Sequence, residues 1–379
     1  MIPVTSISTF LAERISAGDF PSAVYLVAEH GQPKFADALG RAVVEPQAIP
    51  ATLDTIYDLA SLTKPLITGL ICARRLEAGE LTLDSSISHY LPEFDRADKQ
   101  RITLRHLLTH SSGLPAWRPL YILANGNIDR VLAAIANLDL EYDPGSRVVY
   151  SDLGFITLGL LLERIGGKPL VDLAQAEIIG PLKLEQTFFN PAQAKQTGIA
   201  ACETGNGYER ETCGNDYGNE YKNWRESLIW GEVHDGNAYF LGGAAGHAGL
   251  FSSAAETLIL ANQFHVEQTK LLKPETCKLF RENLTEGLNE ARSVGWQLAT
   301  TKESSAGTDL QADSFGHTGF TGTSCWNEPN LGRVYILLTN RTHNRTLPFV
   351  NINSVRRRFH SSAKTALMTS SSDSNIRAF

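Results

Sequence analysis

The sequence predicts an α+β protein in which an antiparallel sheet, built from both ends of the chain and flanked by helices, carries a mainly helical block inserted between those ends. Pairs of short apolar runs typical of hairpins lie near each end, and helix-period segments dominate residues 61–200. A length of 379 residues suggests about two domains. We expect residues 1–60 and 241–368 to form the sheet domain and residues 61–240 to form the helical domain.

The first segment, MIPVTSISTFLAERISAG, has no basic leader followed by an apolar core. We therefore expect an amphipathic first helix, no secretory signal and a cytoplasmic protein, whereas a periplasmic location would follow if a leader had been removed. The next stretch, SAVYLVAEHGQPKFADALG, places two short apolar runs on either side of a polar turn around Gly31–Pro33. This pattern predicts a β-hairpin.

Helix-period segments follow, several of them closing with a glycine stop signal. They are ITGLICARRLEAG, TLRHLLTHSSG, DRVLAAIANLD and GFITLGLLLERIGG. The longest apolar run, LGFITLGLLL at 153–162, has about half the ~20 residues that a membrane-spanning helix needs, so it predicts a core helix. A cleft between the helical block and the sheet is the natural ligand site.

Residues 201–240 are rich in Gly and Asn and predict a long ordered loop. Its aromatic side chains either line the mouth of a substrate site or anchor the loop; they are Tyr208, Tyr217, Tyr221, Trp224 and Trp230.

The last part of the chain begins with GTSCWNEPNLGRVYILLTN, which predicts a second hairpin. Apolar residues then recur at four-residue spacing, as on the buried face of a helix: Val355, Phe359, Ala363 and Leu367. The basic run Arg356–Arg358 within this helix is expected to be solvated, and the polar tail 369–379 is expected to be disordered.

Composition excludes some classes of partner. A net charge of −7 argues against nucleic acid or an anionic membrane as the main partner. The five cysteines are scattered without the paired spacing of a zinc site, which suits a reducing compartment; they are Cys72, Cys202, Cys213, Cys277 and Cys325.

Several histidines have side chains that could bind a metal, but their spacing favours packing or hydrogen bonding. His234, Asp235 and His247 show no ligand spacing, so we expect hydrogen bonding in a loop or in the core. His106 and His110 stand four residues apart on a predicted helix, and packing is the better interpretation there too.

The stretch ASLTKPL at 60–66 places Ser61 near a helix N-terminus and Lys64 one turn further on, so their side chains can meet. Unpaired N–H groups and the positive end of the helix dipole would suit an oxyanion there. The same pair also fits an N-cap serine and a surface lysine. The spacing alone therefore leaves both interpretations open.

Two further segments, YSDLGF at 150–155 and HTGFTG at 317–322, favour a catalytic role for Ser61 and Lys64. Ser-x-x-Lys, Tyr-Ser-Asp and His-Thr-Gly in this order resemble the serine β-lactamase and penicillin-binding protein superfamily, especially its class C β-lactamase, D,D-peptidase and esterase branch. ITLRHLLTHSSGLP and GGAAGHAGLFSSA look like structural signatures of the same family, so the resemblance spans nearly the whole chain. It implies a β-lactamase/transpeptidase-like fold and a reaction that needs neither metal nor cofactor.

By this resemblance Ser61 is the nucleophile that forms an acyl-enzyme, and Lys64 is its base. Lysine accepts a proton only if its surroundings lower its pKa from about 10.4. Tyr150 would relay a proton to the leaving group or, as tyrosinate, share the role of base.

The third motif implies a substrate-binding strand beside the acyl group. His317, Thr318 and Gly319 would form it, with the backbone N–H groups of Phe320 and Ser61 stabilising the oxyanion. Many β-lactamases have lysine in place of His317, a fixed positive charge, whereas histidine is mostly neutral above about pH 6.5. This difference favours peptidase or esterase activity over efficient β-lactamase activity. It also predicts that the activity depends more strongly on pH.

Asp152 is a second departure, because asparagine is commoner at this place in the family. An ionised aspartate accepts hydrogen bonds but cannot donate one to a substrate carbonyl. It could pair with Lys64 and hold it charged, or bind a substrate amine, and either role puts amide and β-lactam recognition in doubt.

We therefore predict a serine hydrolase that cleaves an ester or amide bond of a small molecule or peptide through an acyl-enzyme on Ser61. A β-lactamase or D,D-carboxypeptidase is the alternative within the same class. A penicillin-binding sensor or scaffold with little turnover is the alternative of another class.

Overall fold

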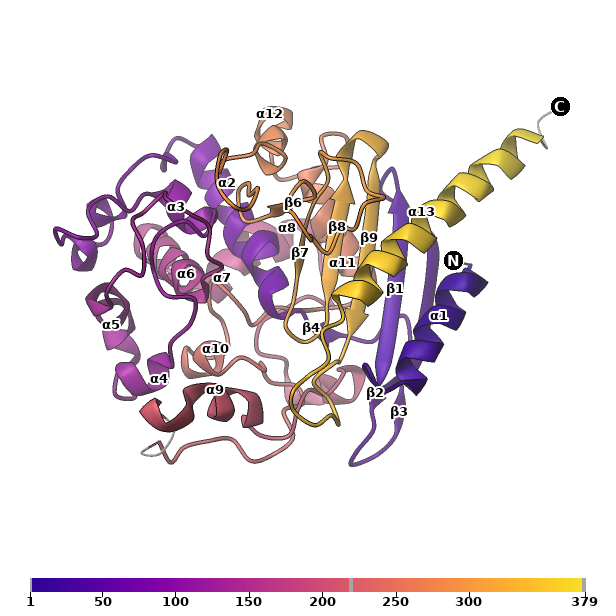
Figure 1. Ribbon diagram of the computed structural model, residues 1–379, viewed down its shortest axis with the longest axis horizontal. Coiled ribbons are helices and arrows are strands. Elements are labelled where there is room, and N and C mark those ends of the chain that lie inside the picture. Colours follow the sequence, from indigo (N-terminus) through magenta and orange to yellow (C-terminus); the bar gives the residue numbers. More distant parts are fainter. Residues whose placement is uncertain (1, 218–220, 377–379) are drawn as a thin grey trace.

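The computed structural model describes residues 2–217 and 221–376 and shows a sheet beside a mainly helical region (Figure 1). Seven strands form one antiparallel sheet in the order β3-β2-β1-β9-β8-β7-β6. These strands are β1 (Ser22–Glu29), β2 (Gln32–Val43), β3 (Ile49–Pro50), β6 (Gln297–Leu298), β7 (Phe315–Thr318), β8 (Ser324–Glu328) and β9 (Arg333–Thr339). A separate ladder pairs β4 (Tyr57–Asp58) with β5 (Phe251–Ser252).

The centre of the sheet joins the two ends of the chain. Strand β1 pairs with β9 from Ala23 opposite Thr339 to Glu29 opposite Arg333. Each of these strands also pairs with its own hairpin partner, β2 or β8. Both predicted hairpins are present, and the predicted α+β class is confirmed.

Both faces of the central strands are buried, and alternate residues contribute to different cores. Ala23, Tyr25 and Val27 of β1 belong to one apolar cluster, whereas Val24 and Leu26 belong to the other. Burial on two sides explains why β1 reads as a continuous apolar run.

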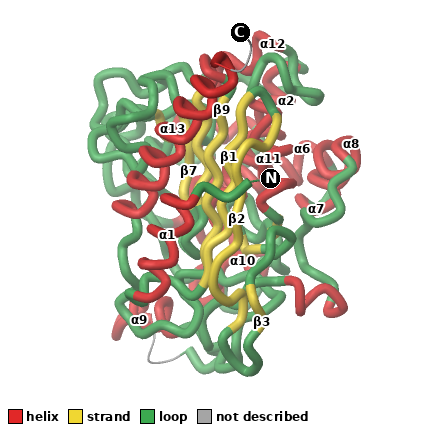
Figure 2. Tube along the Cα trace, turned by 90° about the vertical axis from the view of Figure 1, so that its right-hand side faces the viewer, coloured by secondary structure: helices red, strands yellow, loops and turns green. Residues whose placement is uncertain are grey.

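Helices α1 (Thr5–Ser16) and α13 (Asn353–Ile376) cover one face of the sheet, and Figure 2 shows both of them in front of the strands. The predicted apolar stripe of α13 is buried here, and the Phe359 ring lies 5.9 Å from the Tyr25 ring. Helix α11 (Ala254–Ala261) packs against β1 and β9 and belongs to the other core, which continues into the helical region.

The remaining helices lie mostly in the helical region (Figure 1). They are α2 (Leu70–Glu77), α3 (Leu104–Leu108), α4 (Leu120–Leu123), α5 (Val131–Asn137), α6 (Asp152–Gly166), α7 (Leu170–Ala174), α8 (Gly180–Leu182), α9 (Gly207–Tyr217), α10 (Gly236–Phe240) and α12 (Pro274–Cys277).

Helix α6 begins and ends at clear sequence signals. The Ser151 side chain caps its first turn by accepting a hydrogen bond from the Gly154 N–H at 3.2 Å, and Gly167 follows its last residue with a φ of 63°. Most of its apolar residues are buried, as predicted for a core helix. Within residues 2–217 and 221–376, no helix has both the length and the apolar character to cross a membrane.

Two segments differ from the sequence expectation. Residues 201–240 contain α9, which is interrupted at Gly214 (φ 51°), and α10, rather than loop alone. The α9 sequence is GYERETCGNDY, in which polar residues and two glycines leave no apolar stripe to reveal the helix. Helix α13 continues to Ile376 through most of the tail for which we expected disorder, and residues 377–379 lie outside the described residues.

Candidate active site

Ser61 lies on a tight turn between strand β4 and a helix. Ala60 precedes it with a φ of 48°, in the left-handed region that non-glycine residues rarely adopt. The Asp58 carboxylate accepts a hydrogen bond from the Ala60 N–H at 2.8 Å, and the Thr63 hydroxyl donates to the Ala60 carbonyl at 2.6 Å. The chain then continues through a π-helical turn, Lys64–Gly69, into α2. These local bonds fix the backbone of the turn that carries Ser61.

Lys64 is completely buried, and oxygen atoms of several residues surround its ammonium nitrogen. Nζ lies 2.9 Å from Ser61 Oγ, 3.0 Å from the His247 carbonyl oxygen and 2.7 Å from Asp152 Oδ1. Burial lowers the pKa of Lys64, but the Asp152 carboxylate and Tyr150 outweigh that effect and raise the pKa above its ordinary value. Lys64 is therefore charged before substrate binds. Asp152 has the first of the two roles considered for it, because it pairs with Lys64 and holds the ammonium group charged.

Tyr150 lies beside this cluster, with Lys64 Nζ 5.0 Å from the centre of its ring. Burial raises the pKa of the Tyr150 hydroxyl, while the Lys64 charge and hydrogen bonds with Lys64 and Ser61 oppose the rise, and the net pKa is raised. The ring of His110 packs against it at 4.5 Å. Tyr150 is therefore a neutral phenol at neutral pH, in contact with both other candidate catalytic groups.

Strand β7 brings the third motif to the same place. Strand β6 pairs only with Phe315 and Gly316 of β7, so the two residues that follow are not covered by it. A side chain at Gly319 would come 2.5 Å from the Leu59 carbonyl oxygen and 2.1 Å from Thr323 Oγ1, so only glycine lets this hairpin approach the Ser61 turn.

His317 is buried, and its Nδ1 lies 2.8 Å from the Thr318 carbonyl oxygen. Burial, followed by the charges of Lys64 and Arg292, lowers the pKa of His317 well below its ordinary value. The imidazole is therefore neutral at neutral pH. His317 therefore becomes protonated only under more acidic conditions than an ordinary histidine, and the pH dependence expected from it shifts to lower pH.

A cavity of about 500 Å³ opens over Ser61. We call it the catalytic cavity. Its lining includes Ser61, Tyr150, Asp152, Thr318, Gly319, Phe320, Trp117, Tyr208, Glu209, His234, Asp235, Arg341 and Arg356.

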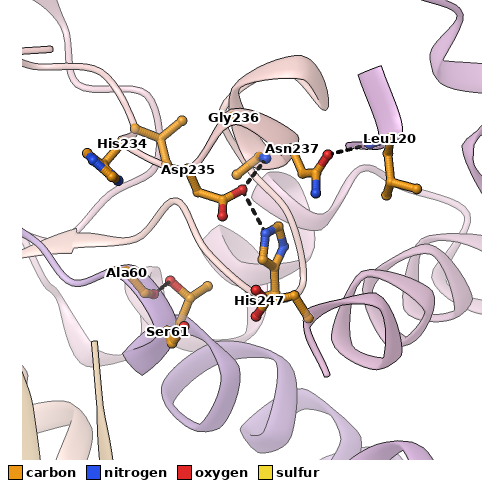
Figure 3. Close-up of polar contacts among 12 residues, drawn as sticks. Ala60, Ser61, Leu120, His234, Asp235, Gly236, Asn237 and His247 are labelled. Atoms are coloured by element: carbon orange, nitrogen blue, oxygen red, sulfur yellow. Dashed lines mark hydrogen bonds and ion pairs between the residues drawn. The ribbon is translucent and has the colours of Figure 1, made fainter. Parts of the chain in front are cut away.

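One wall of the catalytic cavity is acidic and tightly hydrogen-bonded. His247 points its imidazole at Asp235 above the turn that carries Ser61 (Figure 3), and the Nε2 to Oδ1 distance is 2.8 Å. The carbonyl oxygen of the same His247 contacts Lys64. Asp235 Oδ1 also accepts the Ala238 N–H at 2.8 Å and so caps α10. The loop 234–247 is therefore tied to the catalytic cluster by hydrogen bonds, as expected for these histidines.

Glu209 lines the cavity beside Asp235. Its carboxylate accepts hydrogen bonds from the Gly236 N–H at 2.5 Å and from the Tyr121 hydroxyl at 3.0 Å. Burial, together with the nearby charge of Asp235, raises the pKa of Glu209 to about 7. Helix α9 thus contributes an acid that titrates near neutrality.

Two arginines, Arg341 and Arg356, also line the catalytic cavity, and Arg356 corrects a prediction. Arg356 is not on a solvated face: it is buried, and its guanidinium donates to the carbonyl oxygens of Gly319 at 3.1 Å and Thr323 at 3.0 Å. Arg356 lies in the first turn of α13, where the helix passes the end of β7. Helical periodicity in the sequence cannot predict this contact with another element. Arg341 Nε donates to the Phe320 carbonyl oxygen at 2.9 Å.

The aromatic residues in 201–240 were expected either to line a substrate site or to anchor their segment, and the structure shows examples of each. Tyr208 lines the catalytic cavity, and its ring packs 4.6 Å from Phe320. Tyr221 instead anchors its segment against Tyr121 with a ring distance of 5.0 Å. Trp230 does the same by donating its indole N–H to the Ile199 carbonyl oxygen at 2.8 Å.

Sequence reasoning missed five residues that shape the site: Asp58, Glu209, Asp235, Arg341 and Arg356. The sequence suggests Asp235 only as a metal ligand or as a hydrogen-bonding residue of a loop or the core, and the other four residues stand outside the three motifs. The proximity of Asp58 to Ser61 was the one available signal, because a carboxylate two residues before a turn residue can accept its N–H.

A protein-family model and several known proteins resemble this chain. The family model described as Beta-lactamase matches residues 7–354. The chain is 33% identical to a putative D-alanyl-D-alanine carboxypeptidase of Escherichia coli K12, covering 88% of this chain and 81% of that protein. It is 31% identical to an N-acetylmuramyl-L-alanine amidase of Bacillus subtilis 168, covering 88% and 80%.

Among solved structures, the chain resembles EstCE1, described as a hydrolase with promiscuous acyltransferase activity. The TM-score is 0.71 and the identity 25%, over 94% of this chain and 97% of the other.

Proposed function

Because the chain belongs to the Beta-lactamase family of serine hydrolases, we propose that it cleaves an amide or ester bond of a small peptide-like substrate through an acyl-enzyme on Ser61. One observation carries this proposal: a completely buried lysine places its Nζ 2.9 Å from Ser61 Oγ at the base of a cavity of about 500 Å³. A serine hydroxyl becomes a good nucleophile only when a neighbouring group accepts its proton.

Two arginines in the lining of the catalytic cavity support a substrate that carries a carboxylate. They are Arg341 and Arg356, and none of the described carboxylates forms an ion pair with either guanidinium. Buried cations without an anionic partner are costly, and a substrate carboxylate would supply that partner. The names of the two curated relatives, a carboxypeptidase and an amidase, also favour a peptide substrate.

Within this class, the site favours peptidase, amidase or esterase action over efficient β-lactam hydrolysis. His317 is neutral and so offers no fixed positive charge beside the acyl group. Asp152 is engaged by Lys64 and cannot donate a hydrogen bond to a substrate carbonyl.

The test combines covalent labelling with turnover. The wild type should be labelled at Ser61 by a fluorophosphonate, located by peptide mass spectrometry, and should hydrolyse members of a panel of p-nitrophenyl esters, D-alanyl-D-alanine peptides and muramyl peptides. Ser61→Ala should lose the label and lower kcat by roughly 10³-fold or more while keeping the wild-type melting temperature. Ser6→Ala, at an exposed serine of α1, is the matched control. Labelling elsewhere, or activity retained in Ser61→Ala, would refute the assignment.

A penicillin-binding sensor is the second candidate, and the ion pair of Asp152 with Lys64 favours it because a charged lysine is a poor base. Mass spectrometry after incubation with a penicillin separates the two functions. A stable adduct on Ser61 without turnover of any panel member identifies a sensor, whereas rapid release of product identifies a hydrolase.

A further inference from the structure

The surroundings of Lys64 Nζ raise a problem for the proposed reaction. Three oxygens lie 2.7–3.0 Å from it and belong to Ser61, Asp152 and the His247 carbonyl, and the Tyr150 hydroxyl is a further hydrogen-bond partner. An ammonium group has three N–H bonds and no lone pair, so these three close oxygens match the charged form. Before Lys64 can accept the Ser61 proton, one of its own protons has to leave.

Of the groups that carry these three oxygens, only the Asp152 carboxylate can receive that proton. The His247 oxygen is an amide carbonyl, which is not a base at neutral pH, and Ser61 is the group whose proton must be removed. We propose that Asp152 is the terminal proton acceptor of a relay that runs from the Ser61 hydroxyl through Lys64 Nζ to Asp152 Oδ1. This inference rests on the proposed function and adds a catalytic residue to it.

The other titratable groups around the pair are poorly placed for this role. Tyr150 is a neutral phenol, and His110 and His317, which pack against its ring, are imidazoles whose pKa values lie well below the ordinary value because of burial.

Two further charged groups face the cluster, and both are already paired. The Asp235 carboxylate holds His247 at 2.8 Å, and the Arg292 guanidinium, 5.9 Å from the Tyr150 ring, pairs with Glu290 at 2.6 Å. Asp152 is therefore the carboxylate in direct contact with Lys64.

The fold holds Asp152 in place for this transfer. It is the first residue of α6, and its backbone N–H donates to the Ala116 carbonyl oxygen at 2.8 Å, so its main chain is fixed from outside the helix. Its side chain is 19% exposed and lines the catalytic cavity.

The proton steps balance in both halves of the reaction. As Ser61 Oγ bonds to the substrate carbonyl carbon, its proton passes to Lys64 Nζ while an Nζ proton passes to Asp152. When the bond to the leaving group breaks, the Asp152 proton returns through Lys64 to the leaving nitrogen or oxygen. Water then attacks the acyl-enzyme with the same relay, and the stored proton returns to Ser61 Oγ. Asp152 ends each cycle as a carboxylate.

Asp152→Asn tests the relay, because asparagine keeps the size of the side chain but cannot accept a proton. The burst of p-nitrophenol from p-nitrophenyl acetate reports acylation, and the leaving group in this substrate needs no proton. The relay predicts that the acylation rate falls by about 10²–10⁴-fold and that the acid limb of kcat/KM moves to higher pH, because Lys64 must then lose a proton to solvent. Asp152→Glu should recover part of the rate and the wild-type acid limb.

Asp172→Asn, at an exposed first-turn aspartate of α7, is the matched control and should behave as wild type. An Asp152→Asn enzyme that acylates within about threefold of wild type with an unchanged acid limb, or faster, would overturn the relay. Faster acylation would mean that Asp152 only holds Lys64 charged.

Two measurements on the wild type complete the test. Fluorophosphonate labelling of Ser61 separates the outcomes: without the label the proposed function fails, whereas a labelled and active wild type with an unaffected Asp152→Asn enzyme refutes only the relay. Should Asp152→Asn not fold, the temperature dependence of the wild-type acid limb decides. Carboxyl ionisation has an enthalpy near zero and ammonium ionisation a large one, so the relay predicts a limb that barely moves with temperature, and a strongly moving limb contradicts it.

Discussion

Asp58 accepts a hydrogen bond from the backbone N–H of Ala60 at 2.8 Å and so ties the residue before Ser61 to strand β4. Its other carboxylate oxygen accepts the His234 N–H at 2.8 Å, which links the same strand to the acidic wall of the catalytic cavity. Ala60 has a φ of 48°, a conformation that costs about 1–2 kcal/mol in an L-residue. The Asp58 hydrogen bonds offset this cost and stabilise the turn that carries Ser61.

Asp58→Ala should therefore impair both stability and acylation. It leaves two buried N–H groups unpaired, each costing about 1–3 kcal/mol, and removes a constraint on the Ser61 turn. We expect a lower urea midpoint and slower fluorophosphonate labelling of Ser61. Asp58→Asn should be intermediate, because its amide oxygen can accept only one of the two bonds in place. Asp54→Ala, at an exposed aspartate on the same segment, should change neither quantity.

Arg341 gives a prediction about substrate charge. If its guanidinium binds a substrate carboxylate, Arg341→Ala should raise KM for a peptide with a free carboxylate by about 10–100-fold, since a hydrogen bond to a charged group contributes about 1.5–3 kcal/mol. Arg341→Lys should lose less, because it keeps the charge without the planar fork.

The control for Arg341 is the substrate itself. The same peptide with an amidated C-terminus should show nearly equal KM values in wild type and variant. An equal loss for both substrates would show that Arg341 acts through Phe320, whose carbonyl oxygen it binds, rather than on the carboxylate.

The sequence could predict the two hairpins of the sheet because they depend on short-range patterns, whereas the roles of the candidate catalytic motifs rest on the family resemblance. Alternation and turn residues predict the hairpins of β1–β2 and β8–β9, and the helix-start signal predicts the position of Ser61. The partners of Arg356 could not be predicted this way. Its carbonyl acceptors, Gly319 and Thr323, lie 37 and 33 residues away along the chain, and helical periodicity separates apolar from polar faces without showing which polar side chains meet another element.

Glu209 predicts a specific change in stability with pH. Burial and Asp235 raise the pKa of this carboxyl group from 4.5 to about 7. A raised pKa stabilises the folded state most where both states are protonated, below about pH 4.5, and this contribution is lost as the pH rises through 7. Glu209→Gln has no charge to bury and can still accept the Gly236 N–H and bond to Tyr121.

The Glu209→Gln protein should therefore be more stable than wild type at pH 8, by about 2–3 kcal/mol, and similar to it at pH 4.5. Urea unfolding at several pH values measures the difference. Glu211→Gln, at an exposed glutamate of the same helix, should follow the wild-type curve. A difference for Glu209→Gln that stays constant with pH would mean that the pKa of Glu209 is the same in the folded and unfolded proteins.

His110 offers a test of how Tyr150 is positioned. Its ring packs 4.5 Å from the Tyr150 ring, and its Nδ1 accepts the Ser151 N–H at 3.0 Å, so it fixes the segment that carries Tyr150 and Asp152. His110 also has a φ of 59°, a conformation that asparagine tolerates well and phenylalanine does not. Because asparagine Oδ1 can take the place of Nδ1, His110→Asn should keep both the backbone turn and the acceptor. His110→Phe keeps a ring but leaves the Ser151 N–H unpaired on a strained backbone, so we expect its kcat to fall by about tenfold or more relative to His110→Asn, along with a lower melting temperature.

Burial lowers the pKa of His110 well below its ordinary value, so the imidazole is already neutral and neither variant should move the pH profile near neutrality. A shift of that profile in His110→Asn would show that His110 exchanges protons with the catalytic groups, whereas an unchanged profile with reduced kcat in His110→Phe is the result that a positioning role requires.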